Sequence, residues 1–471
     1  MRDLHFPRDY YDENATFPPG DPENPRNWPA WRKWLTVAAI IPVDLSVSWG
    51  ASGFSPAMHS FREHFSISTT VATLGLSLYI LGLAFGPMSL APLSEFFGRS
   101  IVYNASYAVF LVLLAVTALV DNLVAFMVLR FLSGLFACVT VANFGGTIAD
   151  LWPHYETGVA MSLYLWAATC GSPSGFLIMS LVAEGRRWQD VFWALFTICS
   201  VFWIIMLLAV RETRHTTILK RRRRSLARSH RTVRELFQIA LARPFRFLAT
   251  EAIVIFAALY HGYLFGLSFL FNGIFMLVFG HEGHGFSIPG VGFAFLGLVT
   301  GISAGVLTNT WQERRYLRAV GEAGGANIPE ARVHLAKTAA VLFPVSMFCF
   351  AWTTFTWIPP IVPILVSGVW GWCFYTMILM TVVYIGDSYG VYSASALAGT
   401  ALIRNIAGAA FPLFGHHLMK QLGFQWGATL LAVLGVPLVP IPFVLARYGP
   451  AIRRRSPWAS QHMDTMDVDG E

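Results

Sequence analysis

Residues 211–246, RETRHTTILKRRRRSLARSHRTVRELFQIALARPFR, form the longest polar interruption in the chain and decide its architecture. Six long apolar segments precede this stretch and six follow it. Each has about 20 residues or more, enough to cross a bilayer as a helix and too long for a barrel strand. We predict an all-α membrane protein of twelve transmembrane helices in two six-helix halves. The predicted spans are 34–57, 71–93, 101–120, 123–149, 158–183 and 190–210, then 247–278, 287–311, 337–357, 359–384, 392–418 and 424–446.

The composition is typical of a chain surrounded by lipid. Of 471 residues, 55% are hydrophobic and only 13% are charged, whereas a soluble domain has about 25% charged residues. A water-soluble globule could not bury this much apolar surface, and disordered chains and disulfide scaffolds have other compositions. All five cysteines lie inside predicted spans, so we expect no disulfide framework and buried thiols.

The basic residues predict the orientation. With a cytoplasmic N-terminus, 27 of the 33 Lys and Arg residues fall in cytoplasmic segments and four in outside loops. This bias predicts that both termini are cytoplasmic, and it explains the net charge of +7 without nucleic-acid binding. The residues near the start contain no apolar run of the kind that a signal peptide has, so we expect no cleavable signal peptide. The expected divisions are the N-terminal tail 1–33, first half 34–210, basic linker 211–246, second half 247–446 and C-terminal tail 447–471, disordered from Ser456 onward.

Two six-helix halves joined by a linker are the plan of an alternating-access transporter. The basic run at 220–224 within the linker has two interpretations. It is either a solvated loop that touches anionic lipid or a specific regulatory site.

Five ionisable residues lie away from the ends of the predicted spans: Asp44, Arg130, Glu251, His261 and Arg404. Such residues are costly in lipid and are functional by default. A carboxylate at low dielectric can bind and release a proton near neutral pH, and a nearby arginine shifts that equilibrium. We expect Asp44 to exchange a proton; the alternatives are a fixed hydrogen-bonded pair or a water-filled vestibule. His261 is expected to be a packing or cavity residue.

Residues 86–99, GPMSLAPLSEFFGR, lie between the second and third spans. They resemble the signature of the major facilitator superfamily, in the form found in fungal twelve-span drug:proton antiporters and polyamine exporters. The ordered set of matches between about residues 27 and 455 is more specific than any single piece. The further matches are Asn27-Trp28, 72–78 (ATLGLSL), 130–134 (RFLSG), 145–153 (GGTIADLWP), 329–332 (PEAR), 395–398 (SALA), Arg404 and 408–414 (GAAFPLF).

This resemblance implies a conformational gate and a proton-coupling residue. The gate motif comprises Gly86, Pro87, Glu95, Gly98 and Arg99, and the resemblance implies that Glu95 and Arg99 form a charge cluster that closes the cytoplasmic side. Partly buried pairs of this kind can favour one conformer by about 1 kcal/mol or more. In the family the fourth-span arginine, here Arg130, is associated with proton coupling. Our own reading of the residues adds Asp44 as its proton-accepting counterpart.

Three departures from the family pattern bear on function. The family signature has a second basic residue where this chain has Ser100. The fifth-span antiporter motif G-P-x-x-G-P-x-x-G-G is only partly kept, by Gly171, Pro173 and Gly175. Antiport is therefore expected, with uniport as an open alternative. Many polyamine-transporting relatives carry an acidic residue where we align Asn272, which argues against polycations.

Substrate contacts are expected from the first, fourth, seventh and tenth spans of this fold. Polar and aromatic side chains there supply apolar surface with a few hydrogen-bonding groups. For each of them a lipid-facing or interfacial position is an equally good interpretation. The candidates are Ser48, Asn143, Tyr260, Tyr263, Asn272, Trp372 and Tyr375.

We therefore expect a monomeric plasma-membrane exporter that exchanges protons for a small amphipathic metabolite, glycolipid or drug, without cofactor or metal. The rival hypotheses are a polyamine or drug facilitator or uptake transporter, and a membrane receptor without transport. Membrane-embedded enzymes need a nucleophile–base or metal cluster, and the grouping of His281, Glu282 and His284 lacks a further ligand. No G-x-x-x-x-G-K-[ST] loop for ATP is present.

Overall fold

The structure is a computed structural model that describes residues 17–18, 20–153, 156–222, 233–322, 324 and 328–460. Within them, twelve helical segments are long and apolar enough to span a membrane, as predicted. The first half comprises α1 (Ala30–Ser52), α2 (Met58–Phe65), α3 (Thr69–Phe97), α4 (Arg99–Leu119), α5 (Leu123–Ala137), α6 (Val139–Leu151), α7 (Gly158–Ala183) and α8 (Trp188–Ala209). The second comprises α11 (Ala252–Phe279), α12 (Ile288–Ala294), α13 (Leu296–Glu322), α14 (His334–Thr353), α15 (Ile361–Tyr389), α16 (Ser393–Leu422), α17 (Phe424–Gly435) and α18 (Pro440–Arg455).

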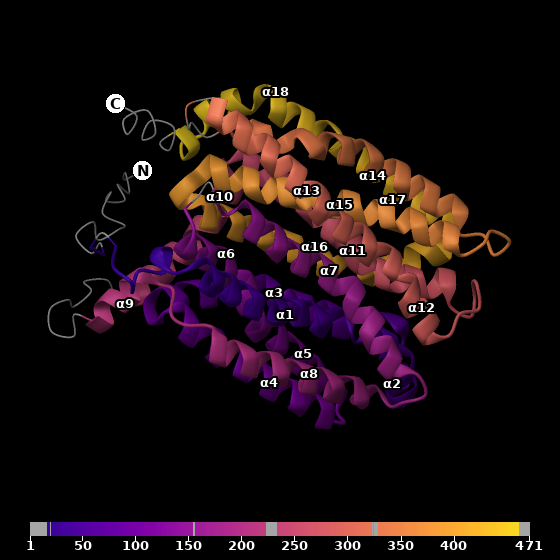
Figure 1. The fold of residues 1–471 in the computed structure, drawn as a ribbon. Helices are drawn as coiled ribbons and strands as arrows, with labels where there is room; N and C mark the ends of the chain where they lie inside the picture. Colours follow the sequence, from indigo (N-terminus) through magenta and orange to yellow (C-terminus); the bar gives the residue numbers. More distant parts are fainter. Residues whose placement is uncertain are drawn as a thin grey trace.

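The predicted linker contains two further helices, α9 (His215–Arg222) and α10 (Val233–Thr250). They lie at the same end of the bundle as the described segments nearest both termini, which we name the terminal end (Figure 1). The opposite end carries α2 and α12 (Figure 1). Residues 223–232, with much of the basic run, and residues 1–16 and 461–471 lie outside the described residues.

Capping and small residues explain where helices begin and how closely they pack. Ser68 and Asn122 accept hydrogen bonds from backbone N–H groups of the first turns of α3 and α5, which those turns otherwise leave unpaired. Gly82 of α3 faces the backbone of α5 at Gly134, and a Cβ at either position would collide with the other helix. Such pairs let helix backbones approach closely where lipid supplies no hydrophobic driving force.

The two halves touch each other along α7 and along α3. Trp166 of α7 donates a hydrogen bond to Ser303 of α13 at 3.0 Å. On the other side, Asn405 of α16 donates to the backbone oxygen of Leu83 in α3 at 3.2 Å. Contacts along α7 extend from Gly158, against Glu313, to Ser180, against Gly292. The halves are therefore in contact along α7 at the terminal end and at the opposite end.

Two expectations are wrong. Cys349 is exposed, because it shares an outward-facing stripe of α14 with Val345 and Trp352, while the other four thiols are buried. The chain is not disordered directly from Ser456: residues 456–460 follow α18 in a defined conformation, and Ala459 is fully buried. Packing of Trp458 on Phe247 of α10 and the hydrogen bond from Ser456 to Glu251 hold this segment in place.

Candidate functional site

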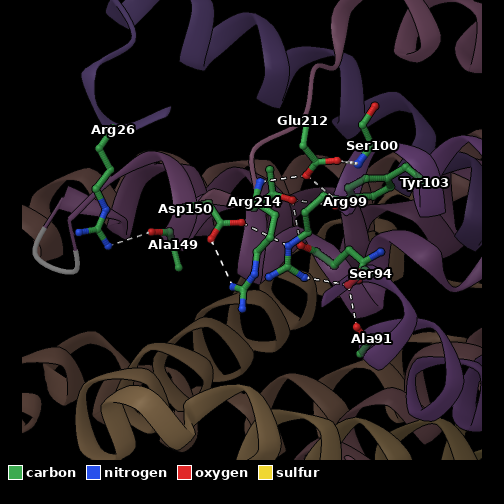
Figure 2. A network of polar contacts seen from close by, with 12 residues as sticks. Arg26, Ala91, Ser94, Arg99, Ser100, Tyr103, Ala149, Asp150, Glu212 and Arg214 are labelled. Atoms are coloured by element: carbon green, nitrogen blue, oxygen red, sulfur yellow. Dashed lines mark hydrogen bonds and ion pairs between the residues drawn. The ribbon is translucent and has the colours of Figure 1, made fainter. Parts of the chain in front are cut away.

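A charge cluster surrounds Arg99, the first residue of α4, at the terminal end of the first half (Figure 2). Its Nε lies 3.3 Å from Asp150 Oδ2 at the end of α6, and its Nη1 donates to Ser94 of α3 at 3.0 Å. Glu95, the predicted partner, also acts electrostatically on this guanidinium. The cluster ties α3, α4 and α6 together, and the side chains of Arg99 and Asp150 are almost fully buried.

Two glycines make room for this cluster. Gly98 has a φ of +102°, a conformation that other residues adopt only with strain, and its Cα lies close to the Glu212 carboxylate. A Cβ on Gly146 of α6 would collide with the Arg99 guanidinium. The Gly98-Arg99 pair and the Gly145-Gly146 pair of the sequence therefore meet at one point in space.

Glu212, which follows α8, is a member of the cluster that sequence reasoning missed. Its carboxylate accepts backbone hydrogen bonds from Arg99 and Arg214 at 2.9 Å each and from Ser100 at 3.3 Å (Figure 2). A carboxylate at a helix N-terminus is stabilised by the unpaired N–H groups and by the helix dipole. The available signal was a lone carboxylate among basic residues, 211–214, directly after the sixth span.

The second half carries a corresponding cluster around Arg332, which lies in the short 3-10 helix Pro329–Val333 just before α14. Its guanidinium lies 2.5 Å from Glu313 of α13 and 3.0 Å from Asp387 of α15, and 3.4 Å above the Tyr316 ring. The carboxylate of Glu313 also lies against Gly158, the first residue of α7 in the other half. Sequence reasoning used residues 329–332 only as a family match and missed Glu313 and Asp387.

A pocket lies beside this contact at the terminal end, between the two halves. It is lined by residues of α7, α13, α14 and α15, among them Asn309, Gln312, Glu313, Tyr375 and Thr376.

A third group of polar side chains lies buried between the halves, and we name Asp44, Thr140, Asn143, Tyr164, His261 and Arg404 the central cluster. Asp44 of α1 is 2% exposed, and its nearest polar influences are Thr140 of α6 and Arg404 of α16. Asp44 and Arg404 both act electrostatically on the Tyr164 hydroxyl. Arg404 also acts electrostatically on the imidazole of His261 in α11. The cluster thus joins residues of both halves around one carboxylate and one guanidinium.

Several polar atoms of the central cluster have no hydrogen-bond partner among the described residues. They are Asp44 Oδ2, Thr140 Oγ1, both amide atoms of Asn143, His261 Nε2 and Arg404 Nε. Because Thr140 and Asn143 are three residues apart, they share a face of α6. Arg404 also lies 4.4 Å from the centre of the Phe265 ring. Buried polar groups without partners are costly in a finished core and mark a place where a ligand can bind.

Arg130 does not pair with Asp44 in this structure. Its Nε and Nη1 donate to the backbone oxygens of Gly75 and Gly50, at 2.7 and 2.8 Å, and its guanidinium lies 4.7 Å from the Tyr79 ring centre. Gly50 is six residues beyond Asp44, about 9 Å along α1. Arg130 therefore connects α5 to α1 and α3, and the arginine that acts on Asp44 comes from the other half.

The structure separates the predicted substrate contacts into three groups. Asn143 is in the central cluster. Asn272 and Tyr375 contact α7 from the second half, with Asn272 bonded to Ser172 at 3.3 Å and Tyr375 bonded to Ser162. The others lie in helix contacts: Ser48 against Gly171, Tyr260 near Cys373, Tyr263 bonded to the Leu431 backbone oxygen, and Trp372 bonded to Thr308 at 3.0 Å.

The remaining motif residues pack helices together. Gly171 and Gly175 place α7 against Ser48 and Ser52 of α1, and Pro173 lies inside α7 between them. Gly86 lies against Cys138 at the end of α5, with Pro87 next to it inside α3. Across the described residues, no three His, Cys, Asp or Glu side chains are placed to hold a metal ion.

Comparisons with known proteins agree with this architecture. The sequence profile of the Major Facilitator Superfamily matches residues 43–402. The chain is 32% identical over 458 residues to the "Major facilitator superfamily multidrug transporter mdrA" of Aspergillus fumigatus, covering 94% of this chain and 75% of the relative. It is 33% identical over 460 residues to the "MFS-type efflux pump MFS2" of Trichophyton rubrum, covering 94% and 77%.

A solved structure is similar in fold. The human organic anion transporter MFSD10 (TETRAN) matches 89% of this chain and 100% of its own, with a TM-score of 0.62 at 15% identity. At that identity the likeness concerns the fold alone. The chain belongs to the major facilitator superfamily.

Proposed function

We propose that this protein is a secondary transporter that exports a small amphipathic organic compound in exchange for protons. The names of the two relatives, a multidrug transporter and an efflux pump, support efflux of small compounds. The distribution of basic residues supports a cytoplasmic terminal end. We place the protein in the plasma membrane as a monomer without catalytic activity.

The observation that carries the proposal is that Asp44 of the first half and Arg404 of the second are both buried in the central cluster, where Arg404 acts electrostatically on the carboxylate. In this structure both halves surround the Asp44 carboxylate, with Arg404 of the second half close enough to act on it electrostatically. When the halves rotate, this interaction weakens and the buried carboxylate takes up a proton. Proton binding and conformation are then linked, which is the requirement for coupling. Arg130 of α5 stabilises the position of α1 by donating a hydrogen bond to the Gly50 backbone oxygen.

The chemistry of the central cluster favours a neutral amphipathic substrate over a polycation. Its one carboxylate faces one guanidinium, so it offers no net negative charge. Thr140 and Asn143 supply unpartnered hydrogen-bonding atoms. The Phe144 ring, stacked on Tyr164 at 4.6 Å, and the Phe265 ring supply apolar surface. Asn272 adds a polar amide without charge.

The test compares small molecules inside and outside cells that lack the protein, express it, or express Asp44→Asn. We expect one compound to accumulate in the deletion strain and to be cleared by wild type but not by Asp44→Asn. Asp121→Asn changes an exposed carboxylate and is the matched control, with efflux like wild type.

Three results would count against parts of the proposal. Lower internal substrate in the deletion strain would indicate uptake. Full rescue by Asp44→Asn, or efflux that persists after collapse of the proton gradient, would remove proton coupling and leave uniport. Binding without flux would indicate a receptor.

A further inference from the structure

The segment that follows α18 is anchored on a buried carboxylate that the transport mechanism does not use. Glu251, 1% exposed, precedes the first residue of α11. Its Oε2 accepts hydrogen bonds from the Ser456 hydroxyl at 2.5 Å and from the Tyr389 hydroxyl at 2.8 Å. Its Oε1 has no partner among the described residues. Ser456 therefore donates its hydrogen bond directly to the Glu251 carboxylate.

The residues after Ser456 are packed into the same place. The Ser456 oxygen accepts the backbone N–H of Ala459 at 2.9 Å, and Ala459 is fully buried. The Trp458 ring lies between Phe247 of α10 and Tyr392, with ring centres 5.2 and 4.9 Å away. The anchor at Ser456 therefore holds an aromatic side chain against α10.

Helix α10 connects this anchor to a contact between the halves. Leu248, next to Phe247, packs with Ala84 and Met88 of α3 and with Leu402 of α16. The α10–α11 corner, where Glu251 lies, thus joins the docked segment to the α3–α16 interface. A change that expels the segment loosens the support of this interface at the terminal end.

The sequence around Ser456 is Arg453-Arg454-Arg455-Ser456-Pro457. Arg454 and Arg455 are exposed, and Pro457 cannot continue the helix. Basic residues directly before a serine are the charge pattern that kinases with acidic substrate grooves select. We propose that Ser456 is a phosphorylation site for an arginine-directed serine kinase and that its phosphorylation undocks residues 456–460. The proposal is independent of the transported compound but requires the cytoplasmic orientation proposed above.

The chemistry of the step sets its effect on docking. The Ser456 oxygen attacks the γ-phosphorus of ATP, the bond to the ADP oxygen breaks, and the hydroxyl proton leaves to the kinase base. The product has lost the donor to Glu251 and carries about −1.5 to −2 charge beside that carboxylate. Like-charge repulsion in a buried site then opposes docking. Because Ser456 is 8% exposed, the kinase acts on the transiently undocked segment, and the phosphate keeps it undocked.

The first experiment incubates the purified full-length protein with ATP and the catalytic domain of an arginine-directed kinase. Phosphate on Ser456 is measured by mass spectrometry in wild type, Glu251→Ala, Glu251→Gln and Ser456→Ala. We expect slow labelling of wild type, about tenfold faster labelling of Glu251→Ala because its hydrogen bond is lost altogether, and an intermediate rate for Glu251→Gln, whose amide oxygen still accepts a neutral hydrogen bond. No phosphate on Ser456 in either wild type or Glu251→Ala overturns the site, and equal rates overturn the anchor.

The second experiment measures undocking without a kinase. Ala459→Cys places a buried thiol in the segment, and its modification by a soluble maleimide is followed on the Ala459 peptide. Ser456→Asp should raise the rate several-fold over Ser456→Asn, its neutral isostere, because only the former repels Glu251. Adding Glu251→Gln to Ser456→Asp should restore protection. Equal rates for Ser456→Asp and Ser456→Asn would overturn the electrostatic mechanism.

Discussion

At the terminal end, each half has a buried arginine–carboxylate pair, but the charged groups around the two pairs differ. In each, a buried arginine at the start of the third span binds a carboxylate at the end of the fourth: Arg99 binds Asp150, and Arg332 binds Asp387. The sixth span of each half is attached differently. In the first half the Glu212 carboxylate binds backbone N–H groups of α4, whereas in the second Arg453 pairs with Glu330.

The two clusters also differ in their contacts with the opposite half. Glu313 of the second cluster binds Arg332 and also lies on the first turn of α7 in the opposite half, where a helix N-terminus favours negative charge. Arg99, Asp150 and Glu212 of the first cluster make their hydrogen bonds and ion pairs within the first half. We therefore propose that Glu313 contributes to the gate between the halves; the gate role of Glu95 and Arg99 stays a prediction.

The largest expected effect is that of removing the central arginine of each cluster. Arg332→Met removes the guanidinium that lies between the Glu313 and Asp387 carboxylates, at a cost of about 3–5 kcal/mol. Arg99→Met should cost less, because Asp150 keeps Arg214 at 3.7 Å. Thermal unfolding of the purified variants measures this order. A larger loss for Arg99→Met would break the comparison, and neutralising Glu313 and Asp387 should rescue Arg332→Met.

The attachments of the sixth spans should differ by a smaller amount. Glu330→Gln leaves the buried Arg453 without a counter-ion and should destabilise by about 2–3 kcal/mol. Glu212→Gln keeps one acceptor for the α4 N-terminus and should cost about 1 kcal/mol. Midpoints of unfolding for the two variants, under the same detergent conditions, test this order. Equal shifts would mean that the two attachments are energetically equivalent.

The contact between the halves is tested by a single methyl group. Gly158→Ala would push the Glu313 carboxylate from the first turn of α7, a loss of about 1–2 kcal/mol, or roughly tenfold in the balance between conformers. A cysteine at Asn309, in the neighbouring pocket, should then be labelled faster from the terminal end. Gly145→Ala is the control, because the nearest atom to its new Cβ is Met161 Cε at 3.7 Å. Equal labelling in both variants would remove Glu313 from the gate.

The smallest expected effect concerns a tie that we find only in the first half among the described residues. Asp21 lies 2.6 Å from Arg222 of α9, and the Glu23 backbone N–H and then Arg222 lower the pKa of its carboxyl. Its contribution is therefore present above the ordinary aspartate pKa and is lost only as the pH falls through the lower value. Efflux should not change through this tie between about pH 5 and pH 7. Arg222→Ala, assayed across this range against wild type, should differ by less than about twofold; a pH-dependent difference would contradict this.

Much of the fold was predictable from the sequence, and less of the site was. Twelve spans and two halves follow from the lengths of the apolar runs. Gly98 and Arg99 stand out because the glycine and the charged arginine interrupt the sequence between two apolar segments. The sequence suggested Arg130, in the same half, as the proton-coupling counterpart of Asp44, which stays a prediction, although the two side chains do not pair in this structure. Nothing local in the sequence shows that Arg130 is satisfied by the backbone oxygens of Gly50 and Gly75.

The sequence by itself determined the membrane class, the span number and the family, because lipid restricts a buried backbone to long apolar helices. It also predicted an exchangeable proton on Asp44, which stays a prediction. Only the tertiary structure decided that Arg404 and Asp44 are buried in one cluster, that Glu313 lies on α7, and that Ser456 is docked on Glu251. These contacts join residues distant in the sequence, and helix packing, not local propensity, determines which side chains meet.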